Sequence, residues 1–438
     1  MGQKSSKARG SYQSNNRSPA QKEGDGLQVS LLTGGLDRHY TFGLSMSLVT
    51  DGVQLEVVGG EGLDSPEMHG TPGLKFLNLR KKPRRDAGLL KRAAVLMGYY
   101  ARLIAYAWNS RPGIFHILWN NKIVYFDRTI LMLYYKILGK KIAITAHNVN
   151  KARRDGHDSL INRLSLKVQY RLADHIFVHT RKMKDELLKD FGVSANAATI
   201  IPYGINNAVP QSNLTPDEAK RRLGIDDGEK TLLFFGNMRP SKGLDYMLGA
   251  FERLIDEGAN FRLIVAGQPI KGYKNYWSRV RPVLRRIEER GSLILRNEFI
   301  PDEDIALYVK AADVLVLPYT DIFQSGVLFM AYSFGLPVIA TDVGSLSEDI
   351  IEGRTGFLCK PRDAVDLAST IEKYFASDLF MELDDRRQEI RDYATARHSW
   401  SVVARTTHSV YQGLTEKAPL RSRLWQAVHL WSDSGRGC

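Results

Sequence analysis

Two short segments of the chain combine the residue types that bind a phosphate group. The first is the turn Gln324-Ser325-Gly326, which follows an apolar strand and precedes a short apolar helix. The second is the loop after Phe234-Phe235-Gly236, which carries Arg239 and Lys242 just before a helix begins. Backbone N–H groups at a helix N-terminus attract anions, and nearby cations neutralise a diphosphate as its charge develops. Arg239 and Lys242 alone are equally well explained as solvated surface charges, so the prediction depends on their pairing with the turn.

Both segments belong to a regular alternation of short β-branched runs and helical stretches. In the first half we expect strands at residues 29–32, 54–58, 115–118, 142–145 and 175–179, separated by helices at 36–49, 89–108, 129–138, 160–172 and 182–189. In the second half we expect strands at 231–235, 262–266, 293–295, 314–317 and 338–340, each followed by a turn and a helix. This alternation predicts an α/β fold with mostly parallel sheets. Ligands of such sheets bind beyond the carboxyl ends of the strands, where both phosphate-binding segments fall.

The length of 438 residues exceeds one comfortable core and predicts two domains. The turn-rich segment 203–216 is a plausible linker. We therefore expect a polar tail at 1–26, an N-terminal acceptor-side Rossmann-like domain at 27–210 and a C-terminal donor domain at 211–400. Residues 401–438 would form a closing helix and a basic tail.

The composition is that of an ordinary globular protein, with 43% apolar and 25% charged residues. Two cysteines, Cys359 and Cys438, do not make a disulfide framework and fit a reducing cytoplasm. No uncharged apolar run reaches the roughly 18 residues of a spanning helix. The net charge of +13 predicts an anionic partner, which could be nucleic acid, a membrane surface or a phosphorylated substrate. No nucleic-acid-binding module is visible, so we expect no nucleic acid.

Residues 79–92 are strongly basic and lead into an amphipathic run at 93–108 that contains Tyr99, Tyr106 and Trp108. Cations followed by interfacial aromatic residues favour contact with an anionic membrane surface. The alternative is a solvated basic loop before a helix that packs on the sheet. Membrane contact would suit an acceptor carried on a membrane lipid.

Four segments of the second half carry a resemblance to a known family. They are GNMRPSKGLDYML (236–248), AADVLVLPY (311–319), SGVLFMAYSFGLPVIATDVG (325–344) and EGRTGFLCKPRD (352–363). In order and spacing they resemble the donor domain of the large retaining glycosyltransferase family 4 (glycosyl transferases group 1). The first half is similar more loosely, through Gly34-Gly35 and residues 145–148 and 174–180. The resemblance implies a GT-B fold, in which two Rossmann-like doubly wound domains face a cleft and a C-terminal helix packs back.

The resemblance also implies roles for the two phosphate-binding segments. Lys242 would grip the donor diphosphate. The arginine of the family falls on Asn237, so Arg239 would have to reach in from two positions away. The amides after the Ser-Gly turn would hold the distal phosphate, which implicates Ser325, Gly326 and Val327.

Further positions follow from the resemblance alone. Gly34 and Gly35 would let the backbone approach the donor phosphate and the acceptor. The loops at Gly267 and at Phe299-Ile300 would lie along the nucleotide base. Relatives use no fixed nucleophile, because the acceptor hydroxyl attacks from the face that the nucleotide leaves.

The sequence departs from the family at two positions. Relatives carry two glutamates eight residues apart, which bind the hydroxyl groups of the donor sugar and of the ribose. Here the positions are Ile322 and Met330, whose side chains accept no hydrogen bond. Asp321 or Gln324 could replace the sugar contact, and the ribose contact has no evident substitute. The chain is thus either a subgroup that binds its donor differently or a protein with weakened or lost activity.

Three histidines are candidates for the cleft. His147 ends a strand, and a histidine there contacts the donor sugar or its leaving phosphate in relatives. The alternative for His147 is a strand-end histidine satisfied by the backbone. We expect a structural role for His179, which ends the next strand, and a place in the cleft for His39, just after Gly34-Gly35.

We expect a cytoplasmic enzyme, peripheral on the inner face of the cell membrane. It would move a hexose with retention from a UDP- or GDP-sugar to a glycan or polyprenyl-linked acceptor, in bacterial polysaccharide assembly. The nucleotide sugar is a co-substrate, and no cofactor is expected. The D-x-D pattern at Asp302-Glu303-Asp304 precedes a helix and is better explained by its N-terminus, so no catalytic metal is expected. The alternatives are a GT-B enzyme of different chemistry, such as an epimerase, and a catalytically degenerate nucleotide-sugar-binding protein.

Overall fold

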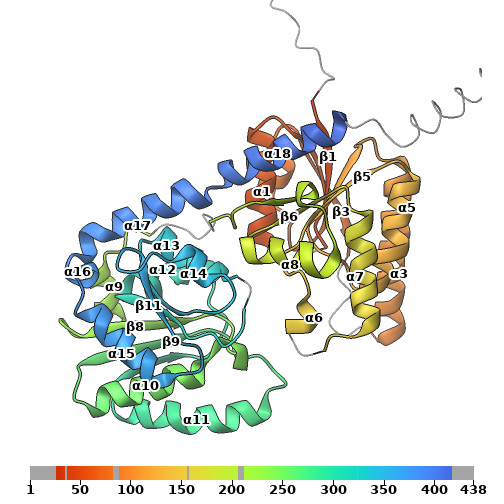
Figure 1. Cartoon of the computed structure of the whole chain (residues 1–438). Helices are drawn as coiled ribbons and strands as arrows, with labels where there is room; N and C mark the ends of the chain where they lie inside the picture. Colours follow the sequence, from red (N-terminus) through yellow and green to blue (C-terminus); the bar gives the residue numbers. More distant parts are fainter. Residues whose placement is uncertain are drawn as a thin grey trace, which may run out of the picture.

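The computed structural model describes residues 26–34, 37–81, 88–154, 157–205, 212–322 and 324–416. Two parallel sheets, each flanked by helices, make up the fold (Figure 1). The seven-stranded sheet has the order β3-β2-β1-β4-β5-β6-β7, and the six-stranded sheet has the order β10-β9-β8-β11-β12-β13. The predicted α/β class with two doubly wound sheets is thereby confirmed.

The strands of the first sheet are β1 (Gln28–Leu32), β2 (Gln54–Gly60), β3 (Leu74–Arg80), β4 (Ile114–Ile117), β5 (Lys141–Thr145), β6 (His175–Val178) and β7 (Ala198–Ile200). Those of the second are β8 (Lys230–Phe235), β9 (Phe261–Ala266), β10 (Leu293–Arg296), β11 (Val314–Leu317), β12 (Val338–Thr341) and β13 (Gly356–Cys359). All neighbouring strands pair in parallel. Helices on both faces bury the central strands completely, which explains their continuous apolar runs.

The helices of the first domain are α1 (Arg38–Thr50), α2 (Pro66–Gly70), α3 (Leu89–Asn109), α4 (Val124–Phe126), α5 (Met132–Ile137), α6 (Lys151–Arg154), α7 (Leu160–Leu172) and α8 (Arg181–Phe191). Around the second sheet lie α9 (Pro216–Leu223), α10 (Leu244–Asp256), α11 (Lys274–Glu289), α12 (Asp302–Ala311), α13 (Gly326–Ser333), α14 (Leu346–Asp349), α15 (Ala364–Phe375), α16 (Asp378–Met381) and α17 (Leu383–His398). The last helix is α18 (Trp400–Glu416).

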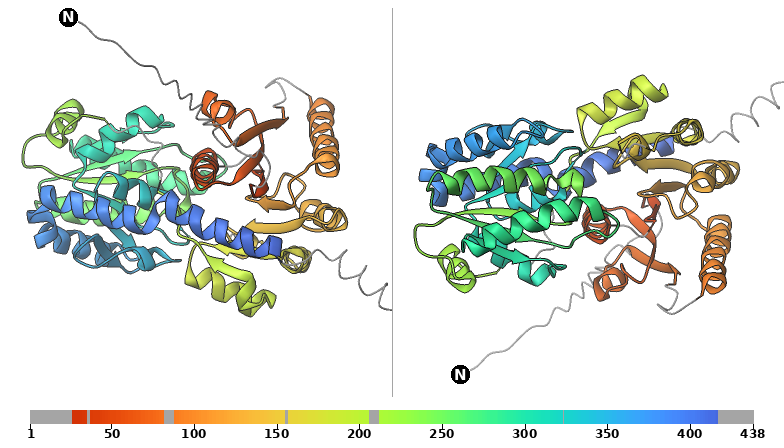
Figure 2. Two further views of the ribbon diagram at one scale, coloured as in Figure 1. Left: turned by 90° about the horizontal axis from the view of Figure 1, so that it is seen from above. Right: turned by 90° about the horizontal axis from the view of Figure 1, so that it is seen from below.

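The C-terminal helix packs back, as expected. α17 lies on the six-stranded domain, and α18 continues across to α1 on the seven-stranded domain (Figures 1 and 2). Trp400, at the turn between them, fills space that two glycines leave open. A Cβ atom would lie 2.1 Å from the Trp400 ring at Gly43 and 2.5 Å from it at Gly204. The two domains are therefore joined at a tightly packed aromatic residue.

The structure differs from the sequence-based expectation in a few elements. The helix expected at 129–138 is divided, because a π-helical turn at Asp127–Leu131 precedes α5. The carboxyl of Asp127 in that turn is buried and accepts a hydrogen bond from the Tyr100 hydroxyl at 2.9 Å. The edge strands β3, β7 and β13 were not predicted, because their short or half-polar sequences lack the continuous apolar run of a central strand.

A buried histidine ties α18 to the first sheet. His116 on β4 contacts the Tyr411 hydroxyl of α18 at 2.5 Å through Nδ1 and the Thr145 hydroxyl at 2.7 Å through Nε2. Complete burial lowers the pKa of His116 from 6.5 to about 3. The stability that its neutral form contributes is therefore full above pH 6.5 and declines as the pH falls toward 3.

We expect His116→Gln to lower the free energy of unfolding by about 2 kcal/mol at pH 7.5, because it disrupts both hydrogen bonds. At pH 5 the unfolded wild-type chain binds a proton at His116 that the folded chain excludes, which costs about 2 kcal/mol. The variant does not pay this cost, so the difference between the two proteins should nearly vanish at pH 5. Urea unfolding of both proteins at pH 7.5 and pH 5 measures this difference in the free energy of unfolding. An equal difference at both would contradict a neutral, buried His116.

Candidate functional site

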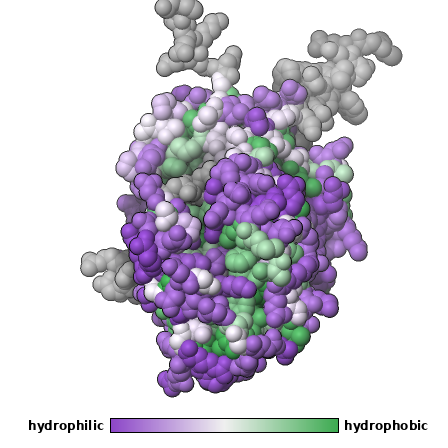
Figure 3. All heavy atoms as spheres, turned by 90° about the vertical axis from the view of Figure 1, so that its left-hand side faces the viewer, coloured by the Kyte–Doolittle hydropathy of each residue, from purple (hydrophilic) through white to green (hydrophobic). Residues whose placement is uncertain are grey.

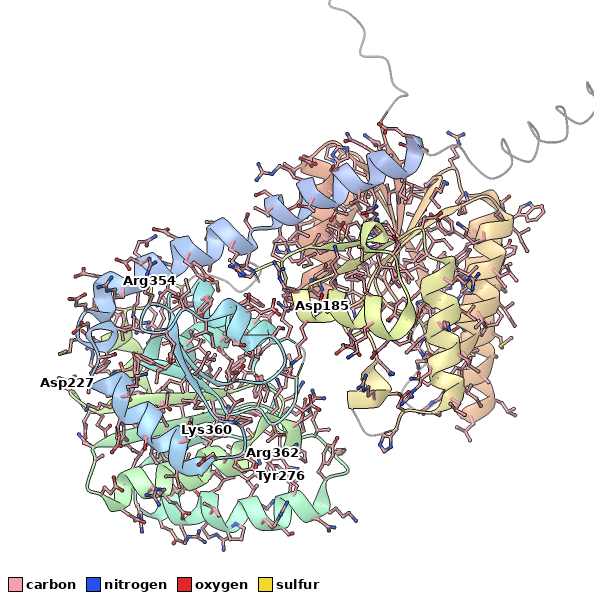
Figure 4. The ribbon with its side chains drawn as sticks, viewed as in Figure 1. Asp185, Asp227, Tyr276, Arg354, Lys360 and Arg362 are labelled. Carbon is pink, nitrogen blue, oxygen red and sulfur yellow. The ribbon has the colours of Figure 1, made fainter. Side chains whose placement is uncertain are left out.

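A cleft of about 770 Å³ lies where the two domains face each other. The first domain lines it with the start of α1 and with residues that follow β4, β5 and β6. The second domain lines it with the loops after β8 and β9 and with the starts of α12 and α13. These are carboxyl ends of parallel strands, at the points where the strand order reverses beside β1 and β8. None of the side chains labelled in Figure 4 lines the cleft.

The structure brings together most of the residues that the sequence singled out. Both phosphate-binding segments reach the cleft, as do all three histidine candidates and the positions of the missing glutamates. The residues of these groups that line it are His39, His147, His179, Arg239, Lys242, Ile322, Gln324, Ser325, Gly326, Val327 and Met330. Asn237 lines it too.

The cationic side of the cleft is organised by α13 and by the loop after β8. Ser325 is the N-cap of α13, but its side chain makes no capping bond and instead meets the Tyr319 hydroxyl at 3.2 Å. The first-turn residues Gly326 and Val327 line the cleft. Lys242 Nζ lies 3.7 Å from the centre of the Tyr319 ring, which fixes the ammonium beside this turn. The arrangement is a positively polarised corner suited to an anion.

Arg239 adds a second cation to this corner. Its Nε is buried and has no hydrogen-bond partner among the residues that the structure describes. A buried donor without an acceptor costs free energy that an anionic ligand would recover. Arg239 lines the cleft although it lies two positions after Asn237 in the sequence. This is consistent with the expectation that Arg239 reaches in from there.

Aromatic rings form the opposite wall. The Trp119 ring stacks on His147 with centroids 4.2 Å apart and planes 4° apart. Tyr40 from α1 meets the His147 ring edge-on at 4.6 Å and the Trp400 ring at 5.1 Å. Tyr203 stacks on Phe329 of α13 at 5.6 Å, so aromatic packing crosses from one domain to the other. These rings hold His147 in one orientation.

Hydrogen bonds determine which nitrogen of His147 carries a proton. Nδ1 of His179 lies 3.2 Å from the Ile201 carbonyl oxygen, which only accepts, so this nitrogen is the donor. Nε2 of a neutral His179 is then an acceptor, and His147 donates to it from Nδ1 over 3.0 Å. Nε2 of His147 therefore holds a lone pair. It is buried and has no protein partner in the described part of the chain.

Burial keeps both rings neutral. It lowers the pKa of His179 from 6.5 to about 4, and it lowers the pKa of His147 well below the usual value, with a further contribution from the neighbouring His179. At neutral pH His147, in the wall of the cleft, thus holds a buried hydrogen-bond acceptor with no protein partner among the described residues. The role of His179 in fixing this tautomer explains a residue that the sequence indicated only as structural.

Two apolar side chains lie in the cleft at the positions where the family resemblance places glutamates. Ile322 and Met330 are both buried and line the cleft. Between them in sequence, Gln324 reaches the buried Asp349 carboxylate at 3.5 Å, and its Oε1 has no partner among the described residues. Burial raises the pKa of Asp349 to about 7. Of the two substitutes considered from sequence, the geometry brings Gln324 to the cleft and leaves Asp321 exposed outside it.

Other predicted positions do not line the cleft, for identifiable reasons. Gly267 makes room for a backbone contact instead, since a Cβ atom there would lie 1.9 Å from the Gly236 carbonyl oxygen. Ile300 is buried in the core of the second domain, and Phe299 is 68% exposed away from the cleft. Gly34 has φ +58° and a Cβ atom there would lie 2.6 Å from the Trp119 carbonyl, so it supports the wall from behind. Gly35 lies outside the described residues.

Polar contacts also join the domains across the cleft. His39 Nε2 lies 3.5 Å from the Asp302 carboxylate at the start of α12. Lys182 Nζ donates to the Gly344 carbonyl oxygen at 3.2 Å. The acids at 302–304 occupy the first turn of α12, as expected for its dipole. Among the described residues, no group of three His, Cys, Asp or Glu side chains could hold a metal ion.

Sequence reasoning missed four residues of the aromatic wall: Tyr40, Trp119, Tyr203 and Trp400. Trp119 directly follows the segment 115–118, so the rule that ligands bind beyond strand ends could have found it. Tyr40 lies on α1, Tyr203 in the segment expected to be a linker, and Trp400 at the start of the helix that passes between the domains. No local sequence pattern indicates a site at these positions.

Residues 33–209 match the family described as "Glycosyltransferase Family 4", and residues 229–377 match "Glycosyl transferases group 1". The chain is 26% identical over 250 residues to a D-inositol 3-phosphate glycosyltransferase of Corynebacterium jeikeium, covering 55% of this chain and 58% of the relative. It is 26% identical over 274 residues to a mannosylfructose-phosphate synthase of Agrobacterium fabrum, covering 60% and 58%. The match thus spans 58% of the length of either relative.

Solved structures share the fold. A sucrose-phosphate synthase of Thermosynechococcus elongatus aligns with TM-score 0.71 and 18% identity over 89% of this chain and 100% of that one. HepE of Anabaena in complex with UDP-glucose aligns with TM-score 0.66 and 15% identity over 88% and 99%. The two family matches lie in order along the two facing domains. The chain belongs to glycosyltransferase family 4 (group 1), with the GT-B fold.

Proposed function

We propose that this protein transfers a hexose, with retention, from a UDP- or GDP-sugar to a glycan or lipid-linked acceptor. One observation carries the proposal: Lys242, Arg239 and the first turn of α13 converge on one side of a cleft whose other wall holds His147. A diphosphate fits the cationic corner, and a sugar fits between that corner and the aromatic wall.

The chemistry follows from this arrangement. The bond between the anomeric carbon and the diphosphate oxygen breaks, and the acceptor oxygen bonds to the same carbon from the same face. The acceptor proton passes to the departing phosphate oxygen. Arg239, Lys242 and the amides of Gly326 and Val327 stabilise the charge on the leaving group. His147 Nε2 accepts a hydrogen bond from a hydroxyl of the donor sugar and positions it.

Because of Met330, we expect the protein to tolerate nucleotides that lack a hydroxyl group on the ribose. With no carboxylate at this position, no strong hydrogen bond to a ribose hydroxyl is available there. We expect UDP and 2′-deoxy-UDP to bind with affinities within about threefold of each other. Removal of the 2′-hydroxyl breaks no strong hydrogen bond when Met330 makes none to it, so it costs little binding free energy. Titration calorimetry with both nucleotides measures this. A preference for UDP above about 30-fold would mean that another polar group binds the ribose.

The proposed acceptor is a wider class of molecules than the proposed donor. Several relatives are named as D-inositol 3-phosphate glycosyltransferases. Beside the cleft, a cavity of about 530 Å³ collects five cations around an apolar floor, and its residue Arg38 lies between the cleft residues Asp37 and His39. These cations are Arg38, Arg80, Lys81, Arg92 and Lys122. They support an acceptor that carries phosphate, including a polyprenyl-diphosphate glycan of polysaccharide assembly.

Ile322 and Met330 favour one competing function, which is nucleotide-sugar binding without transfer. Binding of radiolabelled UDP- and GDP-sugars, followed with and without membrane lipid extract, separates the two. Donor loss matched by labelled product supports transfer. Saturable binding with no release of nucleotide over hours would favour the degenerate protein.

A further inference from the structure

Three neighbouring helices of the first domain expose an apolar surface. α3, α5 and α7 cover one face of the seven-stranded sheet and lie side by side in Figure 1. The Tyr134 hydroxyl of α5 donates to the Ile104 carbonyl of α3 at 3.1 Å. Arg128, just before α5, donates to the Asn162 side chain of α7 at 2.8 Å. We call their outer surface the three-helix face; its large exposed apolar residues are Leu90, Met97, Ile104, Trp108, Ile130, Leu133, Ile137, Leu160, Ile161, Leu164 and Val168.

α3 is apolar on both sides. Its inner residues, such as Tyr100 and Leu103, pack into the core of the sheet. On its outer side Leu90, Met97, Ile104 and Trp108 recur at helical spacing, and Leu90 is 88% exposed. A helix that only covers a core has a polar outer side, so this second stripe is not explained by the fold.

α5 and α7 continue the same surface. Ile130, Leu133 and Ile137 follow one another along the outer side of α5 and the turn before it, and Ile137 is 74% exposed. On α7 the exposed stripe begins at Leu160, which is 77% exposed, and runs through Leu164. Contiguous apolar surface of this kind marks a site of interaction with a protein or a membrane. Figure 3 shows a different side of the molecule, where hydrophilic residues surround an apolar area.

The charged residues on the helices of the three-helix face are positive and favour an anionic partner. The sequences of α3 and α7 contain lysine and arginine but no aspartate or glutamate. Lys91, Lys167 and Arg171 are exposed beside the apolar stripes. Their long side chains reach past buried apolar groups toward anionic head groups. A second copy of the chain would bring like charges together, and the terminal segments 1–25 and 417–438 are themselves net basic.

We propose that the three-helix face docks the protein on an anionic lipid bilayer. The apolar side chains lie below the head groups, and the flanking cations pair with lipid phosphates. No described helix is long and apolar enough to cross a membrane. The inference rests on the proposed function in one respect: a lipid-linked acceptor would be the reason for the enzyme to bind a membrane. Vesicle binding without nucleotide sugar tests it separately from transfer.

The test is flotation of the full-length protein with vesicles of phosphatidylcholine alone or with 30 mol% phosphatidylglycerol. The double variant Ile137→Gln/Leu164→Gln should bind the anionic vesicles about tenfold more weakly, since two apolar side chains no longer enter the interface. Lys167→Glu/Arg171→Glu should do the same and remove the salt dependence. The matched controls lie on the second domain: Val365→Gln/Met381→Gln for exposed apolar residues and Arg279→Glu/Arg281→Glu for exposed cations.

Binding to anionic vesicles that is lost only in the variants of the three-helix face supports the proposal. Equal loss in the charge controls would overturn it, because attraction by net charge would then explain the binding. No vesicle binding, together with a dimer that Ile137→Gln/Leu164→Gln converts to a monomer, would assign the face to a second copy. Unchanged thermal unfolding of each variant confirms that these exposed substitutions leave the fold intact.

Discussion

Replacing Lys242 with alanine is expected to weaken the binding of UDP and of the donor sugar by roughly 100-fold, the size of a lost charge-assisted contact to a diphosphate. Lys242 Nζ lies over the Tyr319 ring, beside the first turn of α13, and Arg239 brings the second cation to the same corner. Arg239→Ala should have an effect of similar size, and the uridine nucleoside, which has no phosphate, should lose nothing in either variant. Titration calorimetry measures all of these affinities.

Lys360→Ala is the matched control for charge, because Lys360 is an exposed lysine of the same domain that lies away from the cleft (Figure 4). Thermal unfolding of Lys242→Ala checks for damage from the lost contact with Tyr319. If both cleft variants bound UDP as the wild type does while remaining folded, the diphosphate would not lie in this corner, and the orientation of the donor would be wrong.

Removing the acceptor nitrogen of His147 is expected to reduce turnover about 100-fold or more in His147→Ala, because the donor sugar loses its positioning contact. His179 acts through His147. His179→Phe leaves the Nδ1 proton of His147 without its acceptor, so the ring can present the wrong tautomer, and we expect a loss of about tenfold in kcat. His179→Gln carries both an acceptor for His147 and a donor for the Ile201 carbonyl, and should restore most of the activity.

The pH dependence provides an independent readout of the same pair. Burial lowers the pKa of His179 to about 4 and that of His147 well below its usual value. Both rings are thus neutral at neutral pH, and protonation begins only as the pH falls toward these values. Transfer should therefore not decline between pH 8 and about 6, where an exposed histidine would titrate. A fall in kcat with a midpoint near 6.5, or full activity of His179→Phe, would contradict the tautomer assignment.

The sequence was sufficient for those parts of the site that lie in one continuous segment. Ser325-Gly326 and the loop with Arg239 and Lys242 each combine a strand end with a helix start, so their place and orientation follow from local rules. The aromatic wall does not follow from such rules. Tyr40, Trp119 and Trp400 are distant in sequence. Tyr40 and Trp119 meet because β1 and β4 are neighbours in the first sheet, and Trp400 joins them where α18 crosses back onto α1.

The same distinction holds for the histidines and the helices. The sequence indicated His147 and His179 separately, but their 3.0 Å contact depends on β5 and β6 being neighbours, and it is this contact that decides the tautomer. An apolar stripe in a helical sequence is normally taken to be core. Only the structure shows that Ile137 and Leu164 point outward while other residues of α5 and α7 fill the core.

The most direct test of the central claim is the product formed from nucleotide sugars. The protein is incubated with UDP- and GDP-hexoses and a membrane lipid extract, and the anomeric configuration of the new linkage is determined by NMR. We expect a hexose to be transferred to a lipid-soluble or glycan acceptor with the configuration of the donor, and no product with Lys242→Ala. Product of inverted configuration, or none from any donor that binds, would contradict it.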